Sequence, residues 1–97
     1  MPLIRLPALM RHYTGGENDF LVEGSTAMEA IRAAVDRFPA LKPHVFDGQS
    51  KLRRHINVFV NDANVRDLDG PDTRVARTDV VRILPAISGG ASSQLTP

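Results

Sequence analysis

The chain has 97 residues, of which 42% are hydrophobic and 24% charged, and a formal net charge of +1 at pH 7. This length allows one small domain with one modest core, and the balanced charge gives no global attraction to nucleic acid or to acidic lipid. The sequence has no cysteine, which excludes disulfides, thiolate metal sites and a cysteine nucleophile. No apolar stretch approaches the roughly 20 residues of a membrane span. We therefore expect a cytoplasmic monomer without a membrane or nucleic-acid partner.

The amino-terminal segment predicts two strands. Apolar residues within segment 3–10 are typical of a first strand, which Pro7 would confine to a sheet edge or a bulge. A Thr-Gly-Gly turn signal follows at residues 14–16. Residues 20–22 then predict a second strand, antiparallel to the first if the connection is a hairpin.

The clearest element is a helix that begins near Thr26. Thr26 and Glu29 have the spacing of a capping box, in which the two side chains bond backbone N–H groups at the helix start. Apolar residues then recur at helical spacing, at Ile31, Ala34, Val35 and Phe38. Pro39 ends the pattern because proline disfavours helical geometry in the residue before it. Such an amphipathic helix needs a sheet on which to bury its apolar side.

The second half of the chain predicts three more strands. Segment 40–54 is expected to be an irregular connection, with turn signals at Lys42-Pro43 and Asp47-Gly48. Residues 55–60 alternate with a period of two, which places Ile56, Val58 and Val60 on one face.

A tight turn at 61–64 should lead into a short return strand that begins with Val65-Arg66. Another turn at 69–72 precedes a final strand over 80–84, with Val81 and Ile83 on one face.

This order of elements predicts an α+β fold of the β-grasp, or ubiquitin-like, type. A mixed sheet of four to five strands would wrap around one main helix. Residues 1–90 would form the domain. Residues 91–97 have no charged side chain and little apolar content, so we expect a disordered extension.

Conventional active-site patterns are missing. His12, His44 and His55 have unrelated spacings and no cysteine beside them, so no metal site is expected. The aspartates of segment 67–72 suit a turn better than a calcium loop, and no serine has a nucleophile-elbow context. The chain is therefore expected to be a substrate or a binding partner of other proteins and not an enzyme.

Lys51, Arg53, Arg54 and His55 form the densest basic cluster. The pattern favours a solvated loop edge, since the interleaved aromatic residues of nucleic-acid platforms are missing. The alternative is a docking patch for an acidic partner surface.

Gly89-Gly90 follows the predicted terminal strand directly. Glycine has no β-carbon to obstruct attack at its carbonyl carbon, and its backbone adopts extended and left-handed conformations without steric cost. A carboxylate at Gly90 would therefore suit chemistry inside a narrow partner active site. The alternative is a simple hinge. Seven further residues, 91–97, follow the glycine pair.

Three segments, 11–16, 57–66 and 81–90, give the chain a resemblance to the ubiquitin-like sulfur carriers of the ThiS/MoaD type. It is most similar to the CysO-like branch that serves cysteine biosynthesis. The resemblance implies that Gly90 is adenylated with ATP by an E1-like enzyme of the MoeB/ThiF type and is then thiocarboxylated.

The resemblance also implies roles for neighbouring residues. Ile87, Ser88 and Gly89 would thread into the partner's active site with Gly90. Phe59, Arg82, Leu84 and Pro85 would dock partner proteins, among them a sulfur-accepting synthase of the cysteine synthase kind. No cofactor would be bound to the carrier itself.

The seven additional residues depart from carriers that end at the second glycine. Some relatives carry extensions that a zinc-dependent JAMM-type peptidase removes, which would place a cleavage site between Gly90 and Ala91. Two other functions remain open: a protein modifier joined through Gly90 to lysines of target proteins, and a ubiquitin-like binding module in which the glycine pair is only a linker.

Overall fold

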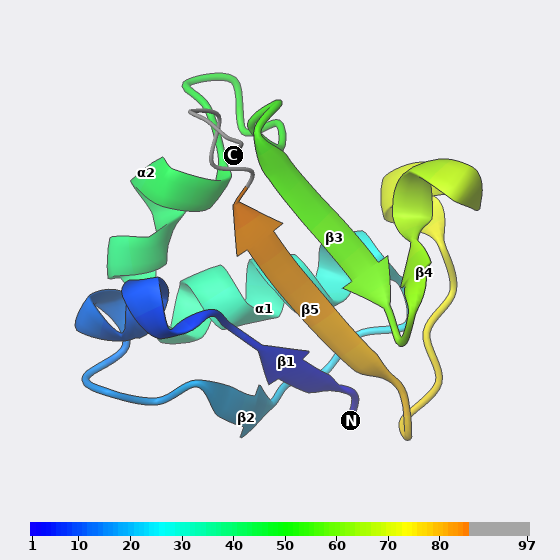
Figure 1. Ribbon diagram of the computed structural model, residues 1–97, viewed down its shortest axis with the longest axis horizontal. Coiled ribbons are helices and arrows are strands. Elements are labelled where there is room, and N and C mark those ends of the chain that lie inside the picture. Colours follow the sequence, from blue (N-terminus) through cyan, green and yellow to red (C-terminus); the bar gives the residue numbers. More distant parts are fainter. Residues whose placement is uncertain (86–97) are drawn as a thin grey trace, which may run out of the picture.

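The computed structural model describes residues 1–85. A five-stranded mixed sheet with the order β2-β1-β5-β3-β4 packs on one main helix, α1 (Figure 1). The strands are β1 (Leu3–Arg5), β2 (Asp19–Leu21), β3 (Ile56–Val60), β4 (Ala63–Asn64) and β5 (Val80–Pro85). β1 and β5 are parallel, and the other pairs are antiparallel. The predicted β-grasp architecture is confirmed.

The helix α1 (Ala27–Arg37) begins at the predicted cap. Thr26 Oγ1 accepts a hydrogen bond from the Glu29 N–H at 3.2 Å. The Glu29 carboxylate accepts from the N–H of Ser25 at 2.9 Å, one residue before the position that a regular capping box uses. Phe38 closes the helix, and Pro39 begins a 3₁₀ turn.

The core lies between α1 and the inner face of the sheet. Val58 and Ile83 are direct partners on β3 and β5, and both are buried. The predicted inward positions of both strands are therefore confirmed. Ile31, Ala34 and Val35 of α1 pack in the same buried cluster. Among the described residues, the last member of this cluster along the chain is Ile83.

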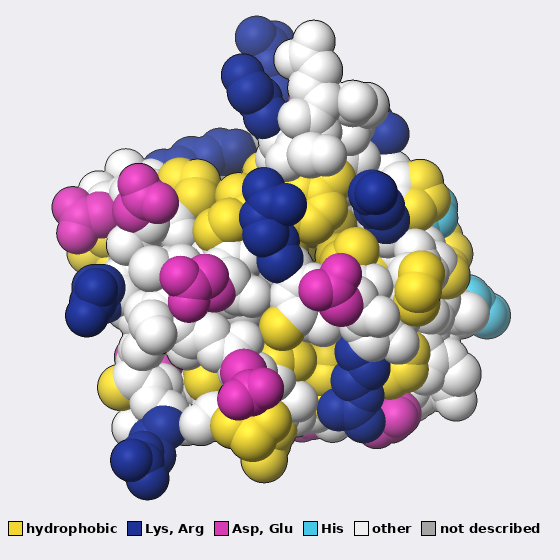
Figure 2. Space-filling view, turned by 180° about the vertical axis from the view of Figure 1, so that it is seen from behind, with side chains coloured by type: hydrophobic (Ala, Val, Ile, Leu, Met, Phe, Trp, Pro, Cys, Tyr) yellow, Lys and Arg dark blue, Asp and Glu magenta, His cyan; other side chains and the backbone are white. Residues whose placement is uncertain are grey.

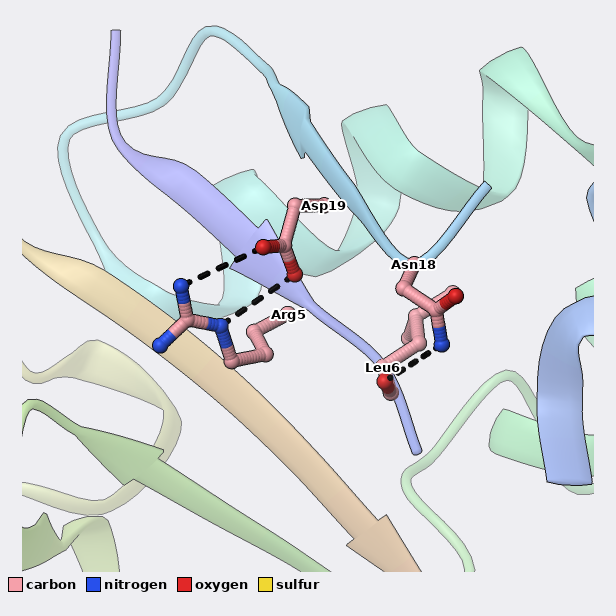
Figure 3. A network of polar contacts seen from close by, with 4 residues as sticks. All are labelled: Arg5, Leu6, Asn18 and Asp19. Atoms are coloured by element: carbon pink, nitrogen blue, oxygen red, sulfur yellow. Dashed lines mark hydrogen bonds and ion pairs between the residues drawn. The ribbon is translucent and has the colours of Figure 1, made fainter. Parts of the chain in front are cut away.

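The first strand is shorter than the sequence predicted, and it is not an edge strand. β1 ends at Arg5, and Ala8–Tyr13 form a 3₁₀ helix whose first hydrogen bond joins Met10 N–H to the Pro7 carbonyl. The Leu6 N–H donates to the Asn18 carbonyl at 2.8 Å, and the Asn18 side-chain amide donates to the Leu6 carbonyl at 3.2 Å (Figure 3). Pro7 follows Leu6 directly, and because it has no N–H to donate it ends the pairing without placing β1 at the edge.

The prediction that segment 40–54 is an irregular connection is wrong for residues 40–45, which are helical. A 3₁₀ turn (Pro39–Leu41) runs into the short helix α2 (Lys42–Val45), with Pro43 in its first turn, where proline is tolerated. Leu41 and Val45 are fully buried, so tertiary packing holds this short helix in place. The turn at Asp47-Gly48 is present, with Asp47 Oδ1 accepting from the Gln49 and Lys51 N–H groups.

The return strand also differs from the prediction. β4 comprises Ala63 and Asn64, and Val65–Asp67 form a 3₁₀ helix in place of a strand. Asn64 Oδ1 accepts from the Arg66 N–H at 2.9 Å. This side-chain cap bends the backbone away from the sheet.

Candidate functional site

The end of β5 is anchored in the middle of the sheet. β5 is held by β1 on one side and by β3 on the other. Leu84 pairs with Asn57 and Pro85 with Ile56, up to the last described residue. Residues 86–90 therefore follow a fixed point of the fold. The predicted threading residues Ile87, Ser88, Gly89 and Gly90, the cleavage site at Ala91 and the extension 91–97 all lie outside the described residues.

The outer face of the sheet carries a row of residues from neighbouring strands. Strand pairing aligns Asp19, Arg5, Arg82 and Phe59 in this order from β2 to β3. These positions alternate with buried residues such as Ile4 and Val81, so they lie on the side away from α1. The predicted docking residues Phe59 and Arg82 are therefore brought together on the outer face.

The two cations of this row differ in their partners. Arg5 forms two 3.2 Å hydrogen bonds with the Asp19 carboxylate (Figure 3), and this carboxylate raises the pKa of Arg5 above its usual value. Arg82 has no acidic partner among residues 1–85, and its guanidinium carbon lies 6.0 Å from the centre of the Phe59 ring. Arg82 is thus the cation of the row that is available to an acidic group of a partner.

The sequence interpretation missed an apolar row beside these residues. Leu3 pairs with Leu21 on β2 and with Val80 on β5. Leu21 is 52% exposed, and Leu3 and Val80 are half-buried. Apolar side chains that gather on a surface are a feature of interaction sites. Alternation along each strand could have placed these residues on the outer face. Their side-by-side arrangement depends on the strand boundaries and the register, which the structure supplies.

A groove lies at the carboxyl-terminal end of β5. This basal groove has a volume of about 300 Å³ and is lined by Leu9, Met10, Tyr13, Pro43, His44, Arg53, His55 and Pro85. The Tyr13 and His44 rings stack with centroids 3.9 Å apart. Arg53 Nε donates to the Pro43 carbonyl at 2.7 Å, and this hydrogen bond restrains the guanidinium beside the groove. Pro85, a predicted docking residue, thus belongs to two features, the strand end and the groove.

The predicted basic cluster borders two cavities. Arg53 and His55 line the basal groove. Arg53 and Arg54 line a second cavity of about 270 Å³ together with Arg66, whose Nη2 donates to the Arg54 carbonyl at 2.9 Å. Of these residues, Arg53 borders both cavities, whereas His55 lines only the first and Arg54 only the second.

The histidines are separated in the same way. His44 and His55 share the basal groove, whereas His12 lies in a different hollow beside Gly15 and Gly16. Within residues 1–85 no group of three potential ligands is placed to hold a metal ion.

The helical side of the molecule shows acidic and basic side chains interspersed with apolar ones (Figure 2). Arg37 of α1 lies 3.8 Å from Glu17, the second ion pair of the described residues. No described helix is both long and apolar enough to cross a membrane.

Known proteins share both the sequence and the fold. The chain is 34% identical over 89 residues to the sulfur carrier protein CysO of Mycobacterium tuberculosis, a match that covers 90% of this chain and 96% of the relative. CysO of Amycolatopsis orientalis, solved in a complex with BexX, superimposes with a TM-score of 0.82 at 36% identity, over 93% of this chain and all of that one. The small archaeal modifier protein 1 of Methanosarcina acetivorans gives a TM-score of 0.79 at 31% identity, over 91% and 94%.

The relatives named CysO are sulfur carrier proteins, which are small carriers and not catalysts themselves. The prediction that this chain is a carrier and not an enzyme is thereby confirmed. The ThiS family profile matches residues 4–90, so the match ends on the second glycine of Gly89-Gly90 and leaves residues 91–97 outside. The shared sequence, the shared fold and the end of this match together mean that the chain belongs to the ThiS family.

Proposed function

We propose that this protein is a sulfur carrier whose active group is the carboxylate of Gly90 after removal of residues 91–97. The observation that carries the proposal is the family match, which ends on Gly90, five residues beyond the sheet-anchored Pro85. A short segment that follows a fixed strand can present its end to a partner enzyme without unfolding the domain.

The chemistry follows from the poor reactivity of a carboxylate. A carboxylate oxygen of Gly90 attacks the α-phosphorus of ATP and releases pyrophosphate, giving an acyl-adenylate. Sulfide from a donor then attacks the acyl carbon and releases AMP, leaving a thiocarboxylate. An E1-like partner of the MoeB/ThiF type supplies the site for both steps, and the carrier needs no bound cofactor.

In the 97-residue chain an amide bond joins Gly90 to Ala91. Hydrolysis of this bond by a peptidase of the JAMM type would release the carboxylate. Until then the chain is an inactive precursor, because an amide carbonyl cannot accept the adenylyl group as a carboxylate does.

The outer face of the sheet is the docking surface in this proposal. Phe59 and Arg82 supply an aromatic group and a cation, and Leu84 and Pro85 lie beside the departing segment. A related carrier, CysO of Amycolatopsis orientalis, forms a complex with BexX, which supports binding of a carrier of this type to another protein. The final acceptor would be a cytoplasmic synthase that forms cysteine or another sulfur-containing metabolite.

Intact mass spectrometry tests the proposal. A chain ending at Gly90 is incubated with the activating enzyme, ATP and a sulfur donor. Its mass should increase by the difference between one sulfur atom and one oxygen atom. The 97-residue chain in the same reaction should stay unchanged. No exchange in the shorter chain, under conditions that modify a known carrier, would contradict the carrier function; exchange in the longer chain would contradict the precursor.

The likeness to the small archaeal modifier protein 1 favours a second function. The same activated carboxylate could form an isopeptide bond with lysines of target proteins. Discrete high-mass adducts that resist reducing agents, detected with an antibody to this chain, would support that function. A binding module without Gly90 chemistry is the third possibility, and it predicts that Gly90→Ala leaves function intact.

A further inference from the structure

We infer that the basal groove is the resting site of this chain's own segment 86–90, with the carboxylate or thiocarboxylate of Gly90 held by Arg53, His44 and His55. The inference rests on the proposed function, because it concerns the chain that ends at Gly90. It adds a regulatory step: the reactive end is sheltered on the carrier until a partner displaces it.

The reach of the segment is sufficient. Pro85 is both the last residue of β5 and a wall of the groove, so residue 86 starts at the groove itself. Five residues span at most about 17 Å when extended. The glycines at 89 and 90 let the backbone turn back without steric cost.

The groove matches the segment in composition. Leu9 is 50% exposed, and together with Met10 and Pro43 it forms an apolar wall. Segment 86–90 offers one large apolar side chain, Ile87, and a terminal negative charge three residues later. Ile87 on the apolar wall would leave the terminal group within about 10 Å, on the cationic side of the groove.

The cationic side of the groove is formed by the Arg53 guanidinium. Arg53 uses Nε for the Pro43 carbonyl, and within residues 1–85 its Nη groups make no hydrogen bond. No acidic residue lines the groove. Asp47 interacts electrostatically with Arg53, but its Oδ1 already accepts hydrogen bonds from two backbone N–H groups, which lower its pKa. A guanidinium with free donors is well suited to a terminal carboxylate.

NMR of the histidine rings tests the inference directly. The described elements and their core lie within residues 1–85, and we expect a chain ending at Gly90 to keep this fold. Two forms of this chain are compared at neutral pH, one with the Gly90 carboxylate and one with a Gly90 carboxamide. We expect shifts of the His44, His55 and Tyr13 ring signals between the two forms and none at His12, which lies outside the groove.

A second readout uses the chemically prepared thiocarboxylate and its rate of alkylation by iodoacetamide. Arg53→Gln should raise this rate by about two- to fivefold, the size that one exposed ion pair provides. Arg54→Gln is the matched control and should leave the rate unchanged, because Arg54 lines the other cavity. If Arg53→Gln loses the dispersed amide spectrum of the fold, the exposed His55→Gln takes its place with the same expected acceleration.

The inference would be overturned if the His44, His55 and Tyr13 ring signals were identical in the carboxylate and carboxamide forms. It would also be overturned if the His12 signal shifted as much as theirs. Equal alkylation rates in the Arg53 and Arg54 variants would overturn it as well. Neither readout needs the activating enzyme. If the ring signals shift but no oxygen-to-sulfur exchange is detected by mass, the proposed function alone is contradicted. If the exchange is detected but the ring signals do not shift, the resting site alone is contradicted.

Discussion

Phe59 and Arg82 are direct partners on β3 and β5, and the Arg82 guanidinium carbon lies 6.0 Å from the centre of the Phe59 ring. Both side chains are half-buried on the outer face of the sheet. The ring holds the cation at the surface by a weak cation–π attraction. This pair therefore presents one aromatic and one cationic contact to a partner at a fixed spacing.

The first prediction concerns binding through this pair. Phe59→Ala and Arg82→Ala should each weaken binding of the activating enzyme by about 5- to 30-fold, because aromatic and arginine side chains dominate interface energetics. The measurement is titration calorimetry with the purified enzyme. Asp36→Asn is the control, since Asp36 is exposed on α1, behind the sheet in Figure 1. Unchanged affinity in both sheet variants would show that this face is not the docking surface.

The second prediction concerns Gly24. A β-carbon at this position would lie 2.7 Å from the backbone nitrogen of Ala30, which is closer than such contacts allow. Gly24→Ala should therefore lower the free energy of unfolding by about 1–3 kcal/mol, measured by urea denaturation.

Gly48→Ala is the matched control for Gly24. A β-carbon at Gly48 has no atom within 4 Å, so the change should stay within about 0.5 kcal/mol. Equal losses in the two variants would mean that the contact with Ala30 is not the cause.

The third prediction concerns the start of α1. Thr26→Ala removes the acceptor of the Glu29 N–H and should cost about 1 kcal/mol of unfolding free energy. Thr26→Asp should restore most of it, because aspartate is also a strong N-cap. Ser25→Ala is the control, since the Ser25 hydroxyl makes no hydrogen bond within residues 1–85. A Thr26→Ala variant as stable as the parent in thermal and urea unfolding would rule out this role.

The fourth prediction concerns pH. Asp79 accepts hydrogen bonds from the Ala76 N–H at 2.8 Å and from Asn61 Nδ2 at 3.1 Å, and these bonds lower its pKa. A lowered pKa in the folded state means that the carboxylate stabilises the fold above the unfolded pKa of about 3.9. This contribution is lost as the pH falls through the folded pKa.

Asp79→Asn should therefore destabilise the protein by about 1 kcal/mol at neutral pH, and the difference from the parent should shrink toward zero in acid. Urea unfolding at several pH values measures it. Asp72→Asn is the control, because the Asp72 carboxylate makes no hydrogen bond among the described residues. A difference that is constant across the whole pH range would exclude an ionic origin.

Several features could be predicted from the sequence because they depend on neighbours along the chain. The cap at Thr26, the end of α1 before Pro39 and the inward faces of β3 and β5 all follow from local periodicity and from residue-specific backbone constraints. The resemblance added the family, and the family match confirmed it. The role of Gly90 stays a prediction, since it lies outside the described residues.

Other features depended on contacts between distant segments. Pro39–Leu41 and Lys42–Val45 are helical because Leu41 and Val45 are buried in the core, a cause that no local pattern reveals. The 3₁₀ helix after Pro7 could not be told from a strand by its apolar content alone.

The sequence by itself determined the cysteine-free composition, the main helix, the alternating strands and the glycine pair beyond the last of them. Only the tertiary structure decided which side chains meet: Arg82 beside Phe59, and Tyr13, His44 and Arg53 around Pro85. The reason is physical. Periodicity fixes the face on which a residue lies, whereas strand order, register and the packing of loops fix its neighbours.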